Sequence, residues 1–199
     1  GLPLQERKKL LKTWIEKNPS PRLGWSEIWP LKNWEDLKQQ KIIGSAEFDH
    51  EGVMIKLKKS TYTAGRPKGP WFKWKKDPNF LDAILMYAQR GHGRRSSYYS
   101  DFTFGVWKED EIVPIGKAYF GFTDAELRKL DNWVRKNTIK RFGPVREVKR
   151  ALVLEIAFDN VHTSPRHKSG IALRFPRIHR IRWDKPINEA DKLVSLLIN

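Results

Sequence analysis

The chain has 199 residues, no cysteine and a formal net charge of +16, from 39 lysines and arginines against 23 aspartates and glutamates. This charge predicts a polyanionic partner, and the absence of cysteine excludes disulfides, thiolate nucleophiles and cysteine-based zinc sites. No apolar run approaches membrane-spanning length, so we expect no membrane partner and a cytoplasmic protein. The length allows one large domain or two small ones, and nine tryptophans indicate a packed core.

The first part of the chain predicts two helices. Apolar residues recur at helical spacing from Leu4 to Ile15, and a proline-rich segment ends this first helix. A short strand is expected from Arg22 to Ile28. The second helix begins after Asn33, which has the chemistry of an N-cap, carries Asp36 in its first turn and reaches at least Gln40.

Two strands around a basic connection follow, in the segment from Glu51 to Lys76. In the second strand, Phe72 and Trp74 share one face and are expected to anchor it in a core. Lys73 and Lys75 then stand side by side on the other face, because side chains alternate along a strand.

Two ammonium groups on one face repel each other unless an anion lies between them, which a polyphosphate or a nucleic-acid backbone would satisfy. Glu51 suggests Mg²⁺, since a carboxylate near phosphates is repelled unless a cation intervenes. Strand parity alone does not place Glu51 on the lysine face. The alternative is a basic edge strand whose exposed lysines discourage aggregation.

The second part of the chain reads as several strands with one inserted helix. The predicted elements are, in order, the strands Leu81–Ala88, Asp101–Trp107, Ile112–Tyr119, the helix Thr123–Asn137, the strand Ala151–Phe158, one or two strands in Gly170–Trp183 broken at Pro176, and a short helix Glu189–Ile198. Thr123 and Glu126 form a capping box. This order matches a five-stranded OB barrel, so the fold class is α+β, mainly β, with domains at residues 1–78 and 79–199.

Basic residues in both parts of the chain form two further candidate sites. Arg180, Arg182 and Asp184 share strand parity and can converge on one point, where arginine suits bidentate phosphate binding. The alternative is a generic basic strand that contacts nucleic acid. The candidate DNA contacts are Arg66, Lys68, Arg90, Arg94, Arg95 and Lys117. For each of these, the alternative is a solvated surface charge.

Three ordered motifs resemble those of the covalent nucleotidyltransferases. EGVMIK resembles their motif IV, WFKWKKDP their motif V, and LRFPRIHRIRWDKP motif VI of the ligases. The intervening YTAGRPKGPW is similar to ATP-dependent DNA ligases specifically. The resemblance extends over nearly the whole chain and is nearest to bacterial-type enzymes. It implies the end of an adenylation domain in residues 1–78 and an OB domain in 79–199.

The resemblance also implies roles for the candidate residues. Lys56, Lys73 and Lys75 match supporting positions, and Glu51 matches a metal-binding position. The phosphates of ATP would be contacted by Lys73, Lys75, Arg174, Arg177, Arg180, Arg182, Asp184 and Lys185. ATP and Mg²⁺ are therefore the expected cofactors and nicked double-stranded DNA the expected substrate. A bacterial-type enzyme would be associated with the nucleoid.

The family's nucleophilic lysine lies in a K-x-D-G motif, and this sequence contains no Asp-Gly dipeptide. The resemblance therefore implies the C-terminal portion of a ligase, inactive alone in forming lysyl-AMP. Its expected partner is the remaining N-terminal part of the adenylation domain, and the truncated face could also support a homodimer. Two alternatives remain: part of an RNA ligase or capping enzyme, and a non-catalytic OB module that binds nucleic acid without any link to ATP.

Overall fold

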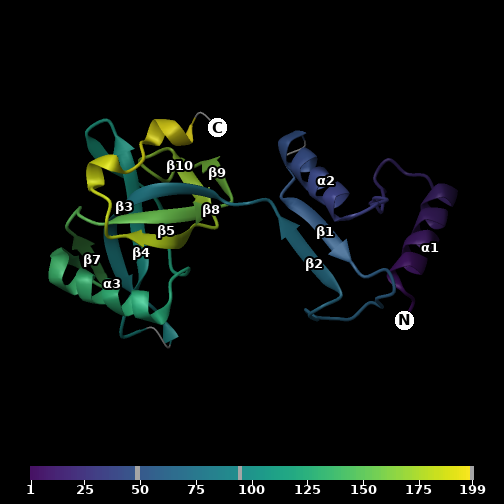
Figure 1. The fold of residues 1–199 in the computed structure, drawn as a ribbon, viewed down its shortest axis with the longest axis horizontal. Helices are drawn as coiled ribbons and strands as arrows, with labels where there is room; N and C mark the ends of the chain where they lie inside the picture. Colours follow the sequence, from purple (N-terminus) through teal and green to yellow (C-terminus); the bar gives the residue numbers. More distant parts are fainter. Residues whose placement is uncertain (48–49, 94–95, 198–199) are drawn as a thin grey trace. The chain divides into compact units, whose positions relative to one another are not determined.

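The structure, a computed structural model, describes residues 1–47, 50–93 and 96–197. The chain divides into two compact units, Gly1–Lys76 and Asp77–Asn199 (Figure 1). The boundary lies between Lys76 and Asp77, close to the expected break after Pro78. None of the described helices is long and apolar enough to cross a membrane.

The first unit contains α1 (Leu4–Lys17), α2 (Trp34–Glu47) and the antiparallel strands β1 (Gly52–Lys56) and β2 (Trp71–Lys75). The predicted N-cap is confirmed, since the amide of Asp36 donates to Oδ1 of Asn33 at 2.9 Å. The predicted strand at Arg22–Ile28 is wrong, and that segment has neither helix nor strand. In the described part of the chain, β1 and β2 pair only with each other, so no third strand supplies hydrogen-bond partners to this sheet.

Most large apolar side chains of the first unit remain exposed. Only Leu4 and Leu37 are buried among the large apolar side chains that the structure describes there. The expected role of Phe72 as a core anchor is wrong, because its side chain is 57% exposed. Two helices and a two-stranded sheet do not supply enough surface to cover these groups. The exposed apolar residues of this unit include Leu10, Leu11, Trp14, Leu23, Ile28, Trp29, Leu31, Trp34, Ile42, Ile43, Leu57 and Phe72.

The second unit is a curled antiparallel sheet. Its main strands are β3 (Asn79–Arg90), β4 (Tyr99–Lys108), β5 (Glu111–Ala118), β8 (Val153–Phe158) and β11 (Arg177–Arg182). They lie in the order β11-β8-β3-β4-β5, which is the strand order of an OB barrel. The amide of Ile178 donates to the carbonyl of Phe120 at 3.1 Å, so the two ends of the sheet meet. The predicted OB fold is confirmed.

Two hairpins were not predicted from the sequence. β6 (Thr138–Phe142) and β7 (Val145–Val148) extend the sheet beside β3, and β9 (Asn160–Thr163) pairs with β10 (Ile171–Arg174). The predicted break at Pro176 separates β10 from β11. β10 falls within the predicted strand segment Gly170–Trp183, whereas β6, β7 and β9 were not predicted. These three strands are four or five residues long, which is too short for a clear alternation of apolar and polar residues.

The helix α3 (Asp124–Asn137) packs on the barrel through Leu127, Leu130 and Val134. Its capping box is confirmed in both directions. The same face also buries Asp131, which the sequence pattern did not predict.

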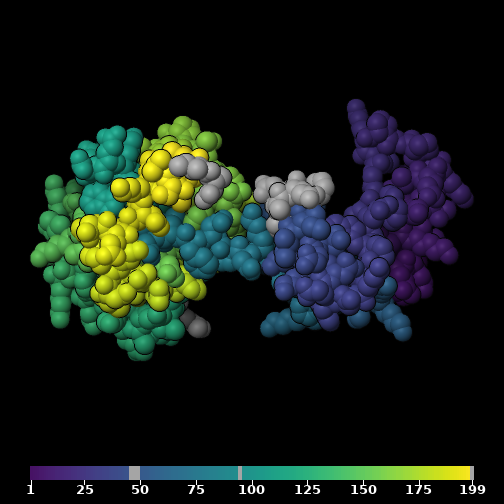
Figure 2. Space-filling model, turned by 45° about the horizontal axis from the view of Figure 1, so that its top comes forward, coloured from purple at the N-terminus to yellow at the C-terminus, as the bar shows by residue number. Residues whose placement is uncertain are grey.

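The predicted helix at Glu189–Ile198 is wrong, and two short 3₁₀ turns, Ile187–Glu189 and Leu193–Leu196, take its place. Between these turns the backbone of Asp191 exchanges hydrogen bonds with the backbones of Asp82 and Trp107. Those bonds hold the segment extended, so a continuous helix cannot form. The C-terminal segment consequently lies on the surface of the second unit (Figure 2).

Candidate nucleotide and nucleic-acid sites

The register of β1 and β2 places three lysines on one face of the small sheet. Lys73 lies opposite Met54, Lys75 opposite Gly52, and Lys56 opposite Trp71. Directly opposed residues of antiparallel strands share a face. The ammonium of Lys56 lies 4.6 Å from the centroid of the Trp71 ring, so this lysine is held against the sheet.

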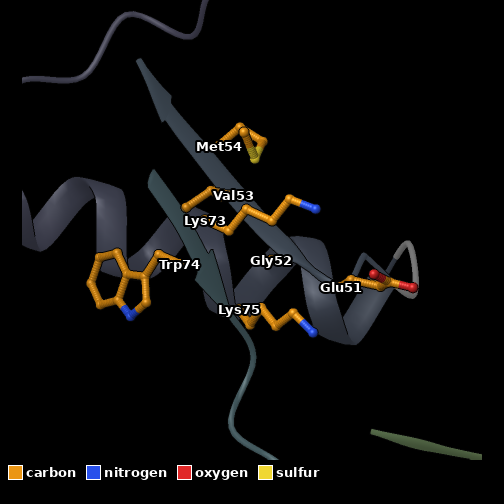
Figure 3. A pocket seen from close by; sticks show the side chains of 7 residues that line it. All are labelled: Glu51, Gly52, Val53, Met54, Lys73, Trp74 and Lys75. Carbon is orange, nitrogen blue, oxygen red and sulfur yellow. The ribbon is translucent and has the colours of Figure 1, made fainter. Parts of the chain in front are cut away.

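A shallow pocket of about 160 Å³ lies on this unit and brings Glu51 together with Lys73 and Lys75. Figure 3 shows both lysine side chains extending toward the side on which the Glu51 carboxylate lies. The pocket is lined by Glu51, Gly52, Val53, Met54, Lys73, Trp74 and Lys75. The structure therefore places the expected metal ligand beside the two expected phosphate ligands.

Gly52 explains how Glu51 reaches this pocket. Its φ of 137° lies in a region that glycine adopts and other residues rarely do. A Cβ at this position would lie 2.2 Å from the carbonyl oxygen of Trp74, so no larger residue fits there. The backbone turn at Gly52 therefore determines where Glu51 lies relative to β1. Strand alternation alone did not show whether Glu51 lies on the same face as the lysines.

The pocket residues suit a magnesium–polyphosphate rather than a bare metal ion. The described part of the chain holds no group of three side chains able to bind a metal. Mg²⁺ is commonly held by one or two carboxylates together with substrate phosphates and water, which a single glutamate satisfies. Lys73 and Lys75 would neutralise the remaining phosphate charge.

On the second unit, the cations of β11 converge as strand parity predicted. Arg182 donates to Asp184 at 2.9 Å, and Arg180 donates to Glu155 at 3.2 Å. Lys185 donates to Asp82 at 2.7 Å. A bulge between Ile178 and Arg180 permits this arrangement, because it turns both polar residues after Ile178 outward while Ile181 still packs inward.

Asp82 and Glu155 complete this cluster, and the sequence analysis gave neither a role in it. They lie directly opposite each other on β3 and β8. Two carboxylates in that position repel unless a cation lies between them. The guanidinium of Arg182 does so, at 3.4 Å from Asp82 and 3.8 Å from Glu155. Each of these two residues is an acidic residue within an otherwise apolar strand, and that pattern could have indicated its role from the sequence.

This ion-pair cluster contains three cations and three carboxylates: Arg180, Arg182, Lys185, Asp82, Glu155 and Asp184. Its formal charge is therefore zero. The hydrogen bond from Arg182 is the main cause that lowers the pKa of Asp184 from 3.8 to about 2. A phosphate would have to displace a carboxylate here or bind the more exposed Arg180, whose side chain is 59% exposed against 18% for Arg182.

Arg174 and Arg177, the other two expected phosphate ligands on the barrel, contact a different part of it. Arg177 donates to Asp159 at 3.0 Å, and the guanidinium of Arg174 lies 5.4 Å from the Phe175 ring centroid. Phe175 itself has a φ of 51° and is 56% exposed. An exposed aromatic residue in the left-handed region is strained, and such strain is common at functional sites. No sequence pattern pointed to a role for Phe175.

The expected DNA contacts are spread over both units. Arg66 and Lys68 are exposed in the connection between β1 and β2, and Lys117 is exposed on β5. Arg90 ends β3, where its guanidinium lies 5.8 Å from the ring centroid of Tyr99. Arg94 and Arg95 lie outside the described residues.

Comparisons with known proteins agree with this architecture. Residues 95–185 match the family described as the ATP dependent DNA ligase C terminal region. A probable DNA ligase of Koribacter versatilis is 46% identical over 96% of this chain and 37% of its own length. A DNA ligase of Methanoculleus marisnigri is 32% identical over 98% of this chain and 34% of its own length.

A solved structure from a study of Lig E DNA ligases has the same fold, with a TM-score of 0.65 and 20% identity, covering 92% of this chain and 59% of that one. The chain spans little more than a third of the length of the two curated relatives described above. With the OB strand order and the matched C-terminal region, these relatives show that the chain belongs to the family of ATP-dependent DNA ligases.

Proposed function

We propose that the intact protein seals nicks in double-stranded DNA with ATP, and that this chain supplies its phosphate, metal and DNA contacts. The family's reaction has three steps: a lysine takes AMP from ATP, the AMP passes to a 5′-phosphate, and a 3′-hydroxyl displaces it. The observation that carries the proposal is the pocket that joins Glu51 with Lys73 and Lys75. Those side chains match the needs of a magnesium-bound polyphosphate.

The residues of this chain act by binding and neutralising charge. Lys73 and Lys75 bind phosphate oxygens and hold them in place during AMP transfer. Glu51 would hold Mg²⁺, which when bound supplies charge neutralisation at the phosphates. Arg180 is exposed enough to contact the departing pyrophosphate, while Arg182 and Lys185 hold the strand through the carboxylates around them.

No lysine of this chain is proposed as the nucleophile. Lys56 is held against Trp71, and Lys73 and Lys75 face the pocket as phosphate ligands. We propose that the K-x-D-G lysine lies in the remaining part of the adenylation domain. That part would cover the exposed apolar side chains of the first unit, since exposed apolar surface is typical of an interface. A homodimer through the same face is the alternative for the chain alone, and a nucleoid-associated location in the cytoplasm follows from the DNA substrate.

The experiment combines this chain with a separately produced segment that carries K-x-D-G, together with ATP, Mg²⁺ and nicked DNA. We expect sealing that falls at least tenfold in Lys73→Ala or Lys75→Ala and stays unchanged in Lys17→Ala, which removes an exposed lysine at the end of α1. The same nick in an RNA duplex separates DNA ligases from RNA ligases. Retention of labelled AMP by this chain alone after denaturation would refute the absence of a nucleophile.

A second candidate function rests on the neutral ion-pair cluster of β11. Because Arg180, Arg182 and Lys185 are already paired with carboxylates, the barrel could act as a nucleic-acid-binding module with no link to ATP. That reading predicts salt-dependent DNA binding whose strength does not change when ATP and Mg²⁺ are added. It also predicts no sealing in the combined experiment.

A further inference from the structure

Three arginines from three different elements surround one aromatic ring of the second unit. Their guanidinium carbons lie 5.8 Å (Arg90, β3), 5.4 Å (Arg135, α3) and 5.8 Å (Arg146, β7) from the ring centroid of Tyr99. The three charges therefore lie within about 12 Å of one another. Like charges at such separations repel to the extent that salt does not screen them, and the screening length at physiological salt is about 8 Å.

The chain offsets this repulsion only in part. Asp131 pairs with Arg135 at 2.7 Å, and Arg146 donates to the backbone carbonyls of Gly143 and Val145. Within residues 1–47, 50–93 and 96–197, no carboxylate pairs with Arg90 or with Arg146. Arg141 also lies directly opposite Arg146 across β6 and β7, an arrangement of like charges that is unfavourable without an anion.

A buried carboxylate holds the cluster in place. Asp131 is 5% exposed, and it accepts hydrogen bonds from the backbone amide of Tyr99 at 2.8 Å and from Nε of Arg135. Arg135 also donates to the carbonyl of Ser97 at 3.0 Å, which ties the loop after β3 to α3. Figure 1 shows this loop and α3 at the same end of the unit. Arg135, and Arg146 through its bonds to backbone carbonyls, are therefore positioned before any ligand binds, which reduces the entropy lost on binding.

We propose that Arg90, Arg135 and Arg146 form a second anion site that binds the phosphodiester backbone of double-stranded DNA. The proposal rests on DNA being the substrate, as proposed above. Arginine forks bind phosphate oxygens in pairs, and phosphate contacts position a protein without reading sequence. That suits an enzyme that joins ends of any sequence.

The site is distinct from the ion-pair cluster of β11. Asp82, in that cluster, and Arg90 both lie on β3, and their spacing corresponds to about 25 Å of extended strand. The two sites would therefore bind different phosphates, the pyrophosphate at Arg180 and the duplex backbone at the arginines around Tyr99.

The test measures binding of the 199-residue chain to a fluorescein-labelled nicked duplex between 50 and 200 mM salt. Each lost phosphate contact reduces the slope of log K against log salt by about 0.9. We expect the double variant Arg90→Gln/Arg146→Gln to reduce the slope by about 2 and to weaken binding at least tenfold. Lys108→Gln removes an exposed charge at the opposite end of β4 from Tyr99 and should leave the slope nearly unchanged. Arg146→Lys keeps the charge and should retain most of the slope.

The single variant Arg90→Gln is the control for misfolding. The Arg90 side chain makes no hydrogen bond within the described residues, so its replacement should leave the fold intact. This variant should reduce the slope by about 0.9. A double variant that behaves like Lys108→Gln would overturn this site while leaving the ligase proposal intact. Failure of the unmodified chain to bind duplex DNA in a salt-dependent way would overturn both. Sealing that depends on Lys73 would still identify the phosphate pocket separately.

Discussion

The two units carry similar kinds of residues but bury them to very different extents. The second unit surrounds Phe102, Phe104, Leu130 and Ile156 completely, whereas Trp14 and Phe72 of the first unit are 53% and 57% exposed. The expected phosphate pocket lies on the first unit, whose core is the less complete. One unit therefore has a core of its own, while the other carries its pocket on a unit whose large apolar side chains are mostly exposed.

The largest expected effect is on the free energy of unfolding, when one phenylalanine in each unit is replaced by alanine. Phe104→Ala should lower the free energy of unfolding by about 3–5 kcal/mol, because it empties a fully buried position in the barrel. Phe72→Ala should change it by less than about 0.5 kcal/mol in the isolated chain, since most of that ring already contacts water. Urea unfolding followed by tryptophan fluorescence measures both.

Equal losses in the two variants would mean that the first unit buries Phe72 in solution, for example in a dimer. Repeating the measurement over a hundredfold range of protein concentration separates these cases. Only a dimer makes the effect of Phe72→Ala depend on concentration.

The next effect concerns the turn that brings Glu51 to the pocket. Gly52→Ala should destabilise the β1–β2 sheet by about 1–3 kcal/mol, because the new Cβ meets the Trp74 carbonyl and φ is positive. Hydrogen exchange should then quicken at the β1 and β2 amides while the barrel amides keep their protection. Gly24→Ala, at a glycine with nothing within 4 Å of its Cβ position, is the control and should leave both sets of amides unchanged.

A smaller effect is expected at the start of α3, within the well-packed unit. Thr123→Ala removes the two hydrogen bonds of the Thr123 hydroxyl, which accepts from the Glu126 amide and donates to the Glu126 carboxylate, but it keeps the Thr123 backbone amide that also donates to this carboxylate. The loss should lower the free energy of unfolding by about 1 kcal/mol. The Glu126 carboxylate accepts hydrogen bonds from the backbone amide of Thr123, the larger cause, and from its hydroxyl, and both lower the pKa of Glu126 below 4.5. The stability that this carboxylate contributes is therefore present above its unfolded pKa and is lost as pH falls through its folded pKa. Thermal unfolding at pH 7 and pH 3 should show the difference between wild type and Thr123→Ala shrinking at the lower pH.

The smallest effect concerns a single titration in the ion-pair cluster. Asp184 should titrate near pH 2, and Arg182→Gln should return its pKa toward 3.8, because the hydrogen bond from Arg182 is the largest cause of the shift. Carboxyl NMR chemical shifts between pH 1.5 and 6 measure both values. The folded pKa is depressed, so any stabilisation by this pair exists above pH 3.8 and disappears as pH falls toward 2. A midpoint near 3.8 in the unmodified protein would contradict the pairing.

Local patterns gave most of the elements and the candidate residues. Helical spacing and capping signals placed α1, α2 and α3, and alternation placed the two lysines of β2 on one face. The same reasoning failed where local pattern competes with distant contacts. The tail after Pro186 has helix-forming residues, but two backbone hydrogen bonds hold it extended: the Asp191 amide donates to the Asp82 carbonyl, and the Asp191 carbonyl accepts from the Trp107 amide.

The sequence by itself determined the ligase motifs, the OB arrangement of strands and the basic character that predicts a nucleic-acid partner. Only the tertiary structure decided which charges meet, because Lys185 reaches Asp82 across 103 positions of the chain and Arg182 reaches it across 100. Such contacts depend on strand register and on single-residue bulges, which shift every later side chain along the strand. Periodicity over a few residues does not reveal those shifts. Only the folded chain therefore shows that Asp82 lies opposite Glu155 and that three arginines surround Tyr99.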